Sequence, residues 1–250
     1  MSYVRHGLNN PVKYNDPTGH DPWLVRQAQA NAKTYGVPWQ VVAGLQDAEI
    51  GLDTQPKDYL ETFFWMAAVP VSRIGPQPLR DTARVAISGV LLYQRPNGPG
   101  PGVGNIHLTT ARAVNDYYAA NYANDPAMQL GLGSLADDEL AFVLSLPNVS
   151  TRVMAAYARM LADYRFGSGG APSLTDHGDV AQWTVTDAVA IWHGYRYGVE
   201  MISPGAEGFE MDVFQNRSLD LDMMISAAGG TGKEESMWGS VPYFESYFGR

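Results

Sequence analysis

The chain has 250 residues, of which 45% are hydrophobic, so it can form one large or two small domains with a substantial core. Its net charge of −9 argues against binding to nucleic acid, because an acidic surface repels phosphates, and it gives no electrostatic attraction to an anionic cell wall. Cysteine is absent and the five histidines show no His-x-x-x-His spacing, so we expect no disulfide, no metal site and no cofactor.

The start of the chain lacks the apolar core of a signal peptide. The apolar run at 63–69 is too short to span a bilayer and is followed by Pro70. We therefore expect no membrane insertion, and a protein that acts outside the cell would need another component to deliver it.

Residues 1–20 are rich in turn-forming residues and poor in helix signals. Asn9-Asn10-Pro11 is followed by Asp16-Pro17-Thr18-Gly19-His20, which resembles the segment that ends the core of RHS-repeat proteins, with His20 where leucine is usual. In that family the segment closes a β-cocoon and precedes a variable C-terminal toxin. The resemblance implies an RHS core remnant or linker at 1–20 and a toxin domain at 21–250. The alternative is a plain Pro- and Asn-rich tail.

A first helix is predicted from Pro22 to Tyr35, with Gly36 as its stop. A second follows directly, and its apolar residues recur at helical spacing: Val37, Val41, Val42, Leu45 and Ala48. Glu49 lies at the edge of this face, just before Gly51. Partial burial raises the pKa of a carboxyl group, so Glu49 is a candidate general acid. The alternative is a solvated glutamate at a helix end.

The sequence from Val37 to Glu49 resembles the helix that carries the catalytic glutamate in lytic transglycosylases and goose-type lysozymes. The resemblance implies a mainly α, lysozyme-like fold (α+β with a minimal sheet) that cleaves the β-1,4 bond between N-acetylmuramic acid and N-acetylglucosamine in peptidoglycan. Asp53 is a possible second carboxylate of the kind that glycosidases use, or a helix cap or surface residue. Lytic transglycosylases work without a second carboxylate.

Two further helices are predicted at 57–69 and 78–94, separated by Pro70, Pro76 and Pro78. The lysozyme-like superfamily has a much shorter connection here. We interpret residues 54–97 as an inserted helical hairpin that walls one side of a sugar groove.

The stretch from Asn97 to His107 is rich in glycine and proline, which exclude a helix before Leu108, and Thr109 is a suitable cap for the helix after it. It resembles the second superfamily motif, which implies that Gly102, Gly104 and Asn105 contact substrate and that Asn105 holds the sugar N-acetyl group. Without the resemblance it is a turn-rich connector.

Helices are predicted next at 109–122, from Asp125-Pro126, from Asp137-Asp138, and at 149–164, where Tyr157 is expected to pack in the core. The sequence from Thr186 to Tyr195 resembles the third superfamily motif, with Trp192 in place of tyrosine and His193 in place of asparagine. The resemblance implies that Trp192 stacks on a sugar and that His193 donates to the acid or to the substrate. A histidine satisfied within the protein is the alternative.

Together these features predict a secreted or delivered antibacterial effector, a polymorphic toxin that acts in the periplasm or cell wall of a target cell. Its partners would be peptidoglycan strands, an RHS core as delivery shell, and a cognate immunity protein. The alternative is a non-catalytic lysozyme-shaped module that binds glycan or protein.

Overall fold

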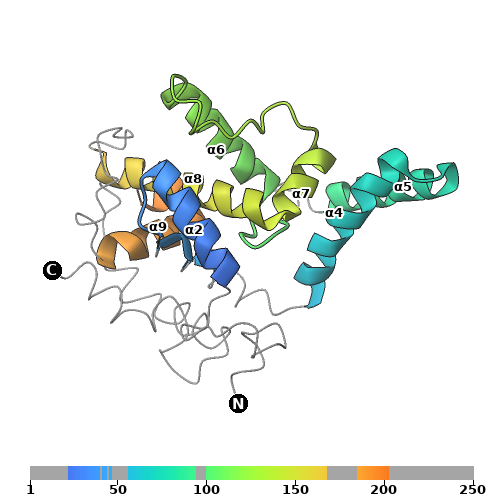
Figure 1. Cartoon of the computed structure of the whole chain (residues 1–250), viewed down its shortest axis with the longest axis horizontal. Coiled ribbons are helices and arrows are strands. Elements are labelled where there is room, and N and C mark those ends of the chain that lie inside the picture. The colour runs from blue at the N-terminus through green and yellow to red at the C-terminus, as the bar shows by residue number, and fades with distance from the viewer. Residues whose placement is uncertain are drawn as a thin grey trace, which may run out of the picture. The chain divides into compact units, whose positions relative to one another are not determined.

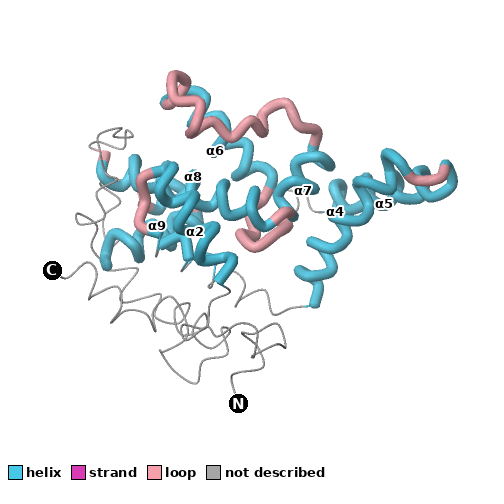
Figure 2. The backbone as a smooth tube through the Cα atoms, viewed as in Figure 1, coloured by secondary structure: helices cyan, strands magenta, loops and turns pink. Residues whose placement is uncertain are grey.

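The computed structural model describes residues 22–39, 41–43, 45–46, 56–93, 100–167 and 185–202. Within these ranges the chain forms helices joined by turns and no strand (Figure 2). The prediction of a mainly α protein is confirmed. The proposed RHS remnant at 1–20, its boundary with the following domain, and the C-terminal residues from 203 onward lie outside the described residues.

Bounds are given for seven α-helices and one 3-10 helix, and Figure 1 labels the α-helices. They are α2 (Pro22–Tyr35), α4 (Pro56–Ile74), α5 (Gln77–Tyr93), α6 (Leu108–Asn121), α7 (Asp137–Ser145), α8 (Pro147–Phe166), α9 (Val185–Tyr197) and η2 (Val199–Met201).

The chain divides into two compact units. The first unit comprises Met1–Leu52 and Ala155–Arg250, and the second comprises Asp53–Met154. Helix α8 contributes its start to the second unit and the rest to the first.

The core of the first unit is built on α8, which is buried around most of its circumference from 155 to 163. Several of its residues are alanines, and small side chains let neighbouring helices approach closely. Gly194 of α9 illustrates this: a Cβ added there would lie 2.7 Å from Ile202 and 3.1 Å from Leu161. Ala28, Ala32 and Tyr35 of α2 are also buried.

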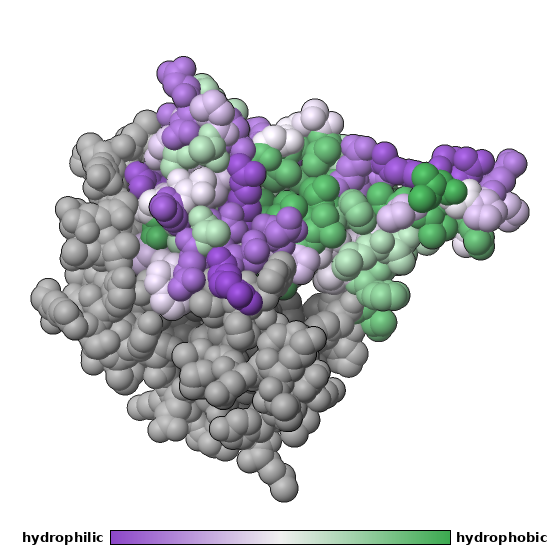
Figure 3. All heavy atoms as spheres, in the orientation of Figure 1, coloured by the Kyte–Doolittle hydropathy of each residue, from purple (hydrophilic) through white to green (hydrophobic). Residues whose placement is uncertain are grey.

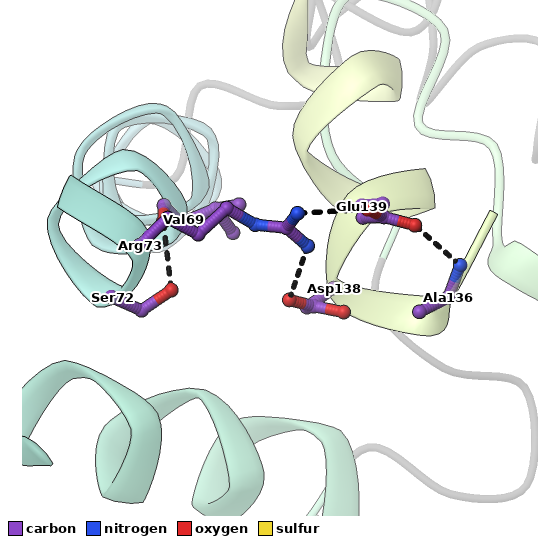
Figure 4. A network of polar contacts seen from close by, with 6 residues as sticks. All are labelled: Val69, Ser72, Arg73, Ala136, Asp138 and Glu139. Atoms are coloured by element: carbon purple, nitrogen blue, oxygen red, sulfur yellow. Dashed lines mark hydrogen bonds and ion pairs between the residues drawn. The ribbon is translucent and has the colours of Figure 1, made fainter. Parts of the chain in front are cut away.

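The second unit contains the predicted helical hairpin, since α4 packs against α5 and also against α7. Trp65 and Val69 of α4 and Ala83 and Ile87 of α5 are buried. Arg73 of α4 makes ion pairs with Asp138 and Glu139 in the first turn of α7, as Figure 4 shows. The hairpin is therefore attached to the rest of its unit by both apolar and ionic contacts.

The first hairpin helix does not end at Pro70 as predicted, but continues to Ile74. A proline in a helix removes one backbone hydrogen bond, a local penalty that packing against other helices can outweigh. Ser72 adds a local bond here, its hydroxyl donating to the Val69 carbonyl over 2.7 Å. Pro78 lies in the first turn of α5, where no amide donor is needed.

Two local predictions further along are also wrong. The N-cap of α6 is His107, which makes no side-chain capping bond, and Thr109 lies inside the first turn. Asp125-Pro126 opens turns and no helix. The Asp125 carboxylate accepts from the Ala127 N–H over 3.0 Å, an Asx turn that competes with helix formation.

Candidate functional site

The chain turns sharply between α2 and the helix that leads toward Glu49. Gly36 has φ +61°, in the left-handed region, and the Val37 N–H donates to the Ala32 carbonyl over 3.0 Å. A glycine with this backbone and this six-to-one bond is a Schellman motif, which satisfies a carbonyl at the helix end. The prediction that Gly36 ends the first helix is confirmed.

The residues after this turn are helical at every described position from Trp39 to Gln46. The predicted apolar face is confirmed as far as it is described, because four of its members are at most 4% exposed: Val37, Val41, Val42 and Leu45. Residues 47–55 lie outside the described residues. Glu49 as the acid and Asp53 as a second carboxylate therefore stay predictions.

A buried ion pair lies beside this turn. Arg159 Nε lies 2.7 Å from Asp163 Oδ1, one turn further along α8, and the two side chains are 7% and 0% exposed. Arg159 Nη1 also donates to the Gly36 carbonyl over 3.4 Å. An interior charge is tolerated only with such partners, so the pair ties α8 to the end of α2. This pair was not predicted from the sequence, although an Arg and an Asp four residues apart in a small-residue helix were a usable signal.

In the second unit, the glycine-rich turn before α6 is held by side chains from other helices. The Gly102 N–H donates to Thr62 Oγ1 over 3.0 Å, and the Gly104 N–H donates to Ser150 Oγ over 2.9 Å. The resemblance implied that Gly102 and Gly104 contact substrate. The amides of both are engaged within the protein, and no sequence signal singled out Thr62 or Ser150.

The two glycines are required by packing. A Cβ on Gly104 would lie 2.7 Å from Met154 Cγ. Gly102 has φ +86°, and a Cβ there would overlap the Leu144 carbonyl. Their bare backbones let the turn lie against α7 and α8, and their predicted role as glycan contacts stays a prediction.

Asn105 differs from the glycines around it. It is half-buried and has φ +45°, the one positive φ at a non-glycine residue among those described. Its N–H donates to the Gly102 carbonyl over 3.2 Å, which fixes it in the turn two residues before His107. Asparagine tolerates this conformation better than most residues, and held strain of this kind gathers at functional positions. Asn105 therefore remains a candidate ligand-binding residue.

Trp192 of α9 is 1% exposed, so the prediction that its indole stacks on a sugar does not fit this structure. Both faces of the ring are covered by protein, and Arg196 Cζ lies 5.8 Å from the ring centroid. The sequence of α9 shows that residue 192 is a tryptophan, but it does not show whether the indole points to solvent or into the core. The side chain of His193 lies outside the described residues.

Tyr157 packs in the first unit, as expected from the sequence. Its hydroxyl donates to the Gly194 carbonyl over 3.2 Å, and its ring centroid lies 5.1 Å from that of Tyr195. Burial, with a smaller contribution from the Glu200 charge, raises the pKa of Tyr157 to about 12. The phenol is therefore neutral at physiological pH and acts as a structural donor.

Over the described ranges, no group of three His, Asp or Glu side chains is placed to hold a metal ion. Within the same ranges, no helix is both long and apolar enough to cross a membrane. Comparison with protein-family models, with curated proteins and with solved structures found no match.

Proposed function

We propose that this chain is a peptidoglycan glycosidase of muramidase or lytic transglycosylase type. Asn105 is the structural observation that carries the proposal: a half-buried amide, locked at positive φ in the turn where the superfamily motif predicts an N-acetyl ligand. The buried face of the helix leading to Glu49 adds support, because it matches the apolar pattern on which that resemblance rests.

In this proposal Glu49 is the general acid that protonates the leaving glycosidic oxygen. In a transglycosylase course the resulting carboxylate then takes the proton of the C6 hydroxyl, which closes an anhydro ring. In a muramidase course it activates water, and Asp53 is the available second carboxylate. Asn105 holds the substrate N-acetyl group, and His193 borders the acid.

The RHS resemblance at 1–20 supports a biological setting for this activity. We propose an antibacterial effector that an RHS core delivers to the periplasm or cell wall of a target cell. A producing cell would then need a cognate immunity protein.

The first test is clearing of purified cell walls, followed by turbidity, with the wild type, Glu49→Gln and Asp53→Asn. Glu49→Gln should slow clearing by roughly 100- to 10,000-fold, the contribution of a general acid. Asp53→Asn is the matched carboxylate control, and an equal loss in this variant would make Asp53 a second catalytic group. Equal clearing by wild type and Glu49→Gln, or none from either, would contradict the proposal.

The role of Asn105 needs variants that keep the backbone. Asn105→Gly tolerates φ +45° and removes the amide, whereas Asn105→Asp keeps the shape and replaces the NH₂ donor with a carboxylate oxygen. Both should raise KM for soluble glycan strands by roughly tenfold, the value of one good hydrogen bond. Unchanged kinetics in both variants would remove Asn105 from the site.

Mass spectrometry of the digested walls separates the two courses. Anhydro ends identify a transglycosylase, and reducing ends identify a muramidase. Intact strands exclude both.

The alternative function is a non-catalytic module that binds glycan or a protein. The buried indole of Trp192 and the internally bonded amides of Gly102 and Gly104 favour it, because these groups are already engaged within the protein. Cosedimentation with insoluble walls, unaffected by Glu49→Gln and without release of soluble fragments, would support this alternative.

A further inference from the structure

Large apolar side chains are exposed on one supersecondary element among the described residues, the hairpin of α4 and α5. Eight of them are at least 36% exposed: Leu60, Phe63, Met66, Val71, Ile74, Leu79, Val85 and Leu92. Figure 3 shows hydrophobic residues gathered over these two helices. An exposed apolar surface of this extent on a folded protein marks an interaction site.

The outward face of α4 has the spacing of a helix-packing seam. Its apolar residues recur at alternating intervals of three and four: Leu60, Phe63, Ala67, Pro70 and Ile74. Met66 and Val71 flank this row, and the helix face that holds buried Trp65 and Val69 points the other way. We call the seven outward residues the α4 seam. A row with this period fits the side-chain ridges of another helix.

We propose that the α4 seam pairs antiparallel with the α4 seam of a second copy of this chain. When the two-fold axis passes Ala67, each residue of one α4 helix faces the residue of the other copy that lies equally far on the opposite side of Ala67. Leu60 then meets Ile74 of the other copy, and Phe63 meets Val71. The small side chain of Ala67 lies at the centre, where two helices approach most closely.

The exposed area agrees with a dimer. The seam exposes on the order of 600 Å² of side-chain surface. Leu60 is 66% exposed, Phe63 72% and Ile74 87%, and Met66 and Val71 contribute smaller areas. Two copies would bury at most about 1,200 Å², which is the lower limit of specific protein interfaces.

Charge does not oppose a second copy at this face. The whole chain carries −9, so two copies repel one another over most surfaces. The α4 seam contains no charged residue, and on the same helix Arg73 is engaged with Asp138 and Glu139 of its own chain. The seam is thus a face where two acidic molecules can meet without opposing like charges.

Helix α5 provides a matched control surface. Val85 is 75% exposed, comparable to Phe63, and lies on the face of α5 opposite the buried Ala83 and Ile87. Because Ala83 and Ile87 pack within the hairpin, Val85 points away from α4 and stays outside the proposed interface.

The first test measures the mass of the full chain by light scattering and sedimentation between about 1 and 200 μM, a range that brackets interfaces of this size. The wild type should dimerise. Phe63→Glu with Ile74→Glu should weaken the dissociation constant at least tenfold, and Val85→Glu should leave it unchanged. All three substitutions fall on exposed positions, and circular dichroism checks that the helices persist.

The second test uses the absence of cysteine from the chain. Ala67→Cys should form a disulfide-linked dimer rapidly under mild oxidation, because the two copies of residue 67 meet at the axis. Leu60→Cys should cross-link no faster than the exposed α5 control Ser88→Cys. Faster cross-linking at residue 60 would mean parallel helices and would overturn the proposed pairing.

A chain that stays monomeric throughout the range overturns the proposal. So does a dimer that Val85→Glu disrupts as strongly as the Phe63 and Ile74 substitutions. A third outcome is a monomer that floats with vesicles of phosphatidylglycerol and phosphatidylcholine. If both Phe63→Glu with Ile74→Glu and Val85→Glu reduce that flotation, the surface binds lipid and the proposed dimer is overturned. None of these outcomes depends on whether the chain cleaves peptidoglycan.

Discussion

The amide nitrogen of Gly104 donates a hydrogen bond to the hydroxyl of Ser150 over 2.9 Å, across 46 residues of sequence. Ser150 is fully buried near the start of α8, and Gly104 is buried in the turn before α6. The contact therefore fixes the turn that presents Asn105.

Ser150→Ala should destabilise the fold by about 1–3 kcal/mol, because a buried N–H would lose its acceptor. Thr82→Ala is the matched control: its hydroxyl donates to Pro78 in an exposed part of α5, and its loss should change stability by less than about 0.5 kcal/mol. Urea unfolding compares the two, and equal effects would show that the bond does not support the turn.

Arg159→Met should destabilise the first unit strongly, by about 3–5 kcal/mol, since it leaves the Asp163 carboxylate buried without its partner. Arg159→Met combined with Asp163→Leu should recover much of that loss, because the uncompensated charge is gone. Thermal unfolding of Arg159→Met, Asp163→Leu and the double variant gives the coupling free energy between the two side chains. Simple additivity would mean that the two side chains act independently.

Glu139 should make stability depend on pH on the acid side. Its carboxylate accepts from the Ala136 N–H over 2.9 Å and pairs with Arg73 over 2.9 Å (Figure 4). The backbone bond first, and the arginine second, hold the pKa of Glu139 below its ordinary value of 4.5. The unfolded chain therefore binds this proton more readily, so Glu139 stabilises the fold above pH 4.5 and loses that effect as pH falls through its lower folded pKa.

Glu139→Gln should flatten the fall in melting temperature between about pH 5 and pH 3. Asp81→Asn is a suitable control, because Asp81 is 62% exposed and its only described ion pair, with Arg84, is 3.8 Å long. The same acid profile in wild type and Glu139→Gln would show that the helix-start contacts of α7 do not contribute.

Tyr157 should make the free energy of unfolding fall as pH rises on the alkaline side. The folded phenol has a pKa of about 12 against 10.0 for a free tyrosine, so its stabilisation is complete below pH 10 and is lost as pH rises toward 12. The loss should approach about 2–3 kcal/mol. Tyr157→Phe should be less stable than wild type at pH 8, since it lacks the bond to Gly194, and this difference should shrink at higher pH. Urea unfolding between pH 8 and pH 11 measures it, and a constant difference would contradict the raised pKa.

Local signals predicted several elements well. Pro22 and Gly36 bracket α2 as their backbone preferences require, and the apolar spacing through Val37, Val41 and Leu45 predicted a buried helical face. The predicted helix at 149–164 lies within α8. These features depend on a few neighbouring residues, so sequence alone carries them.

Predictions that depended on distant neighbours were less successful. Pro70 is a strong helix breaker, yet α4 continues through it because α5 and α7 pack along that helix. A glycine-rich turn is equally suited to contact a ligand or another helix. Only the positions of Thr62, Ser150 and Met154 decide that Gly102 and Gly104 serve internal packing.

The sequence by itself determined that this is a mainly helical protein and where most of its described helices lie, because helix periodicity and end signals act over a few residues. Tertiary structure alone decided that Trp192 is buried, that Arg159 and Asp163 form an interior pair reaching Gly36, and that the α4 seam faces outward. Burial and pairing depend on which distant helices arrive beside a residue, and no local pattern contains that information.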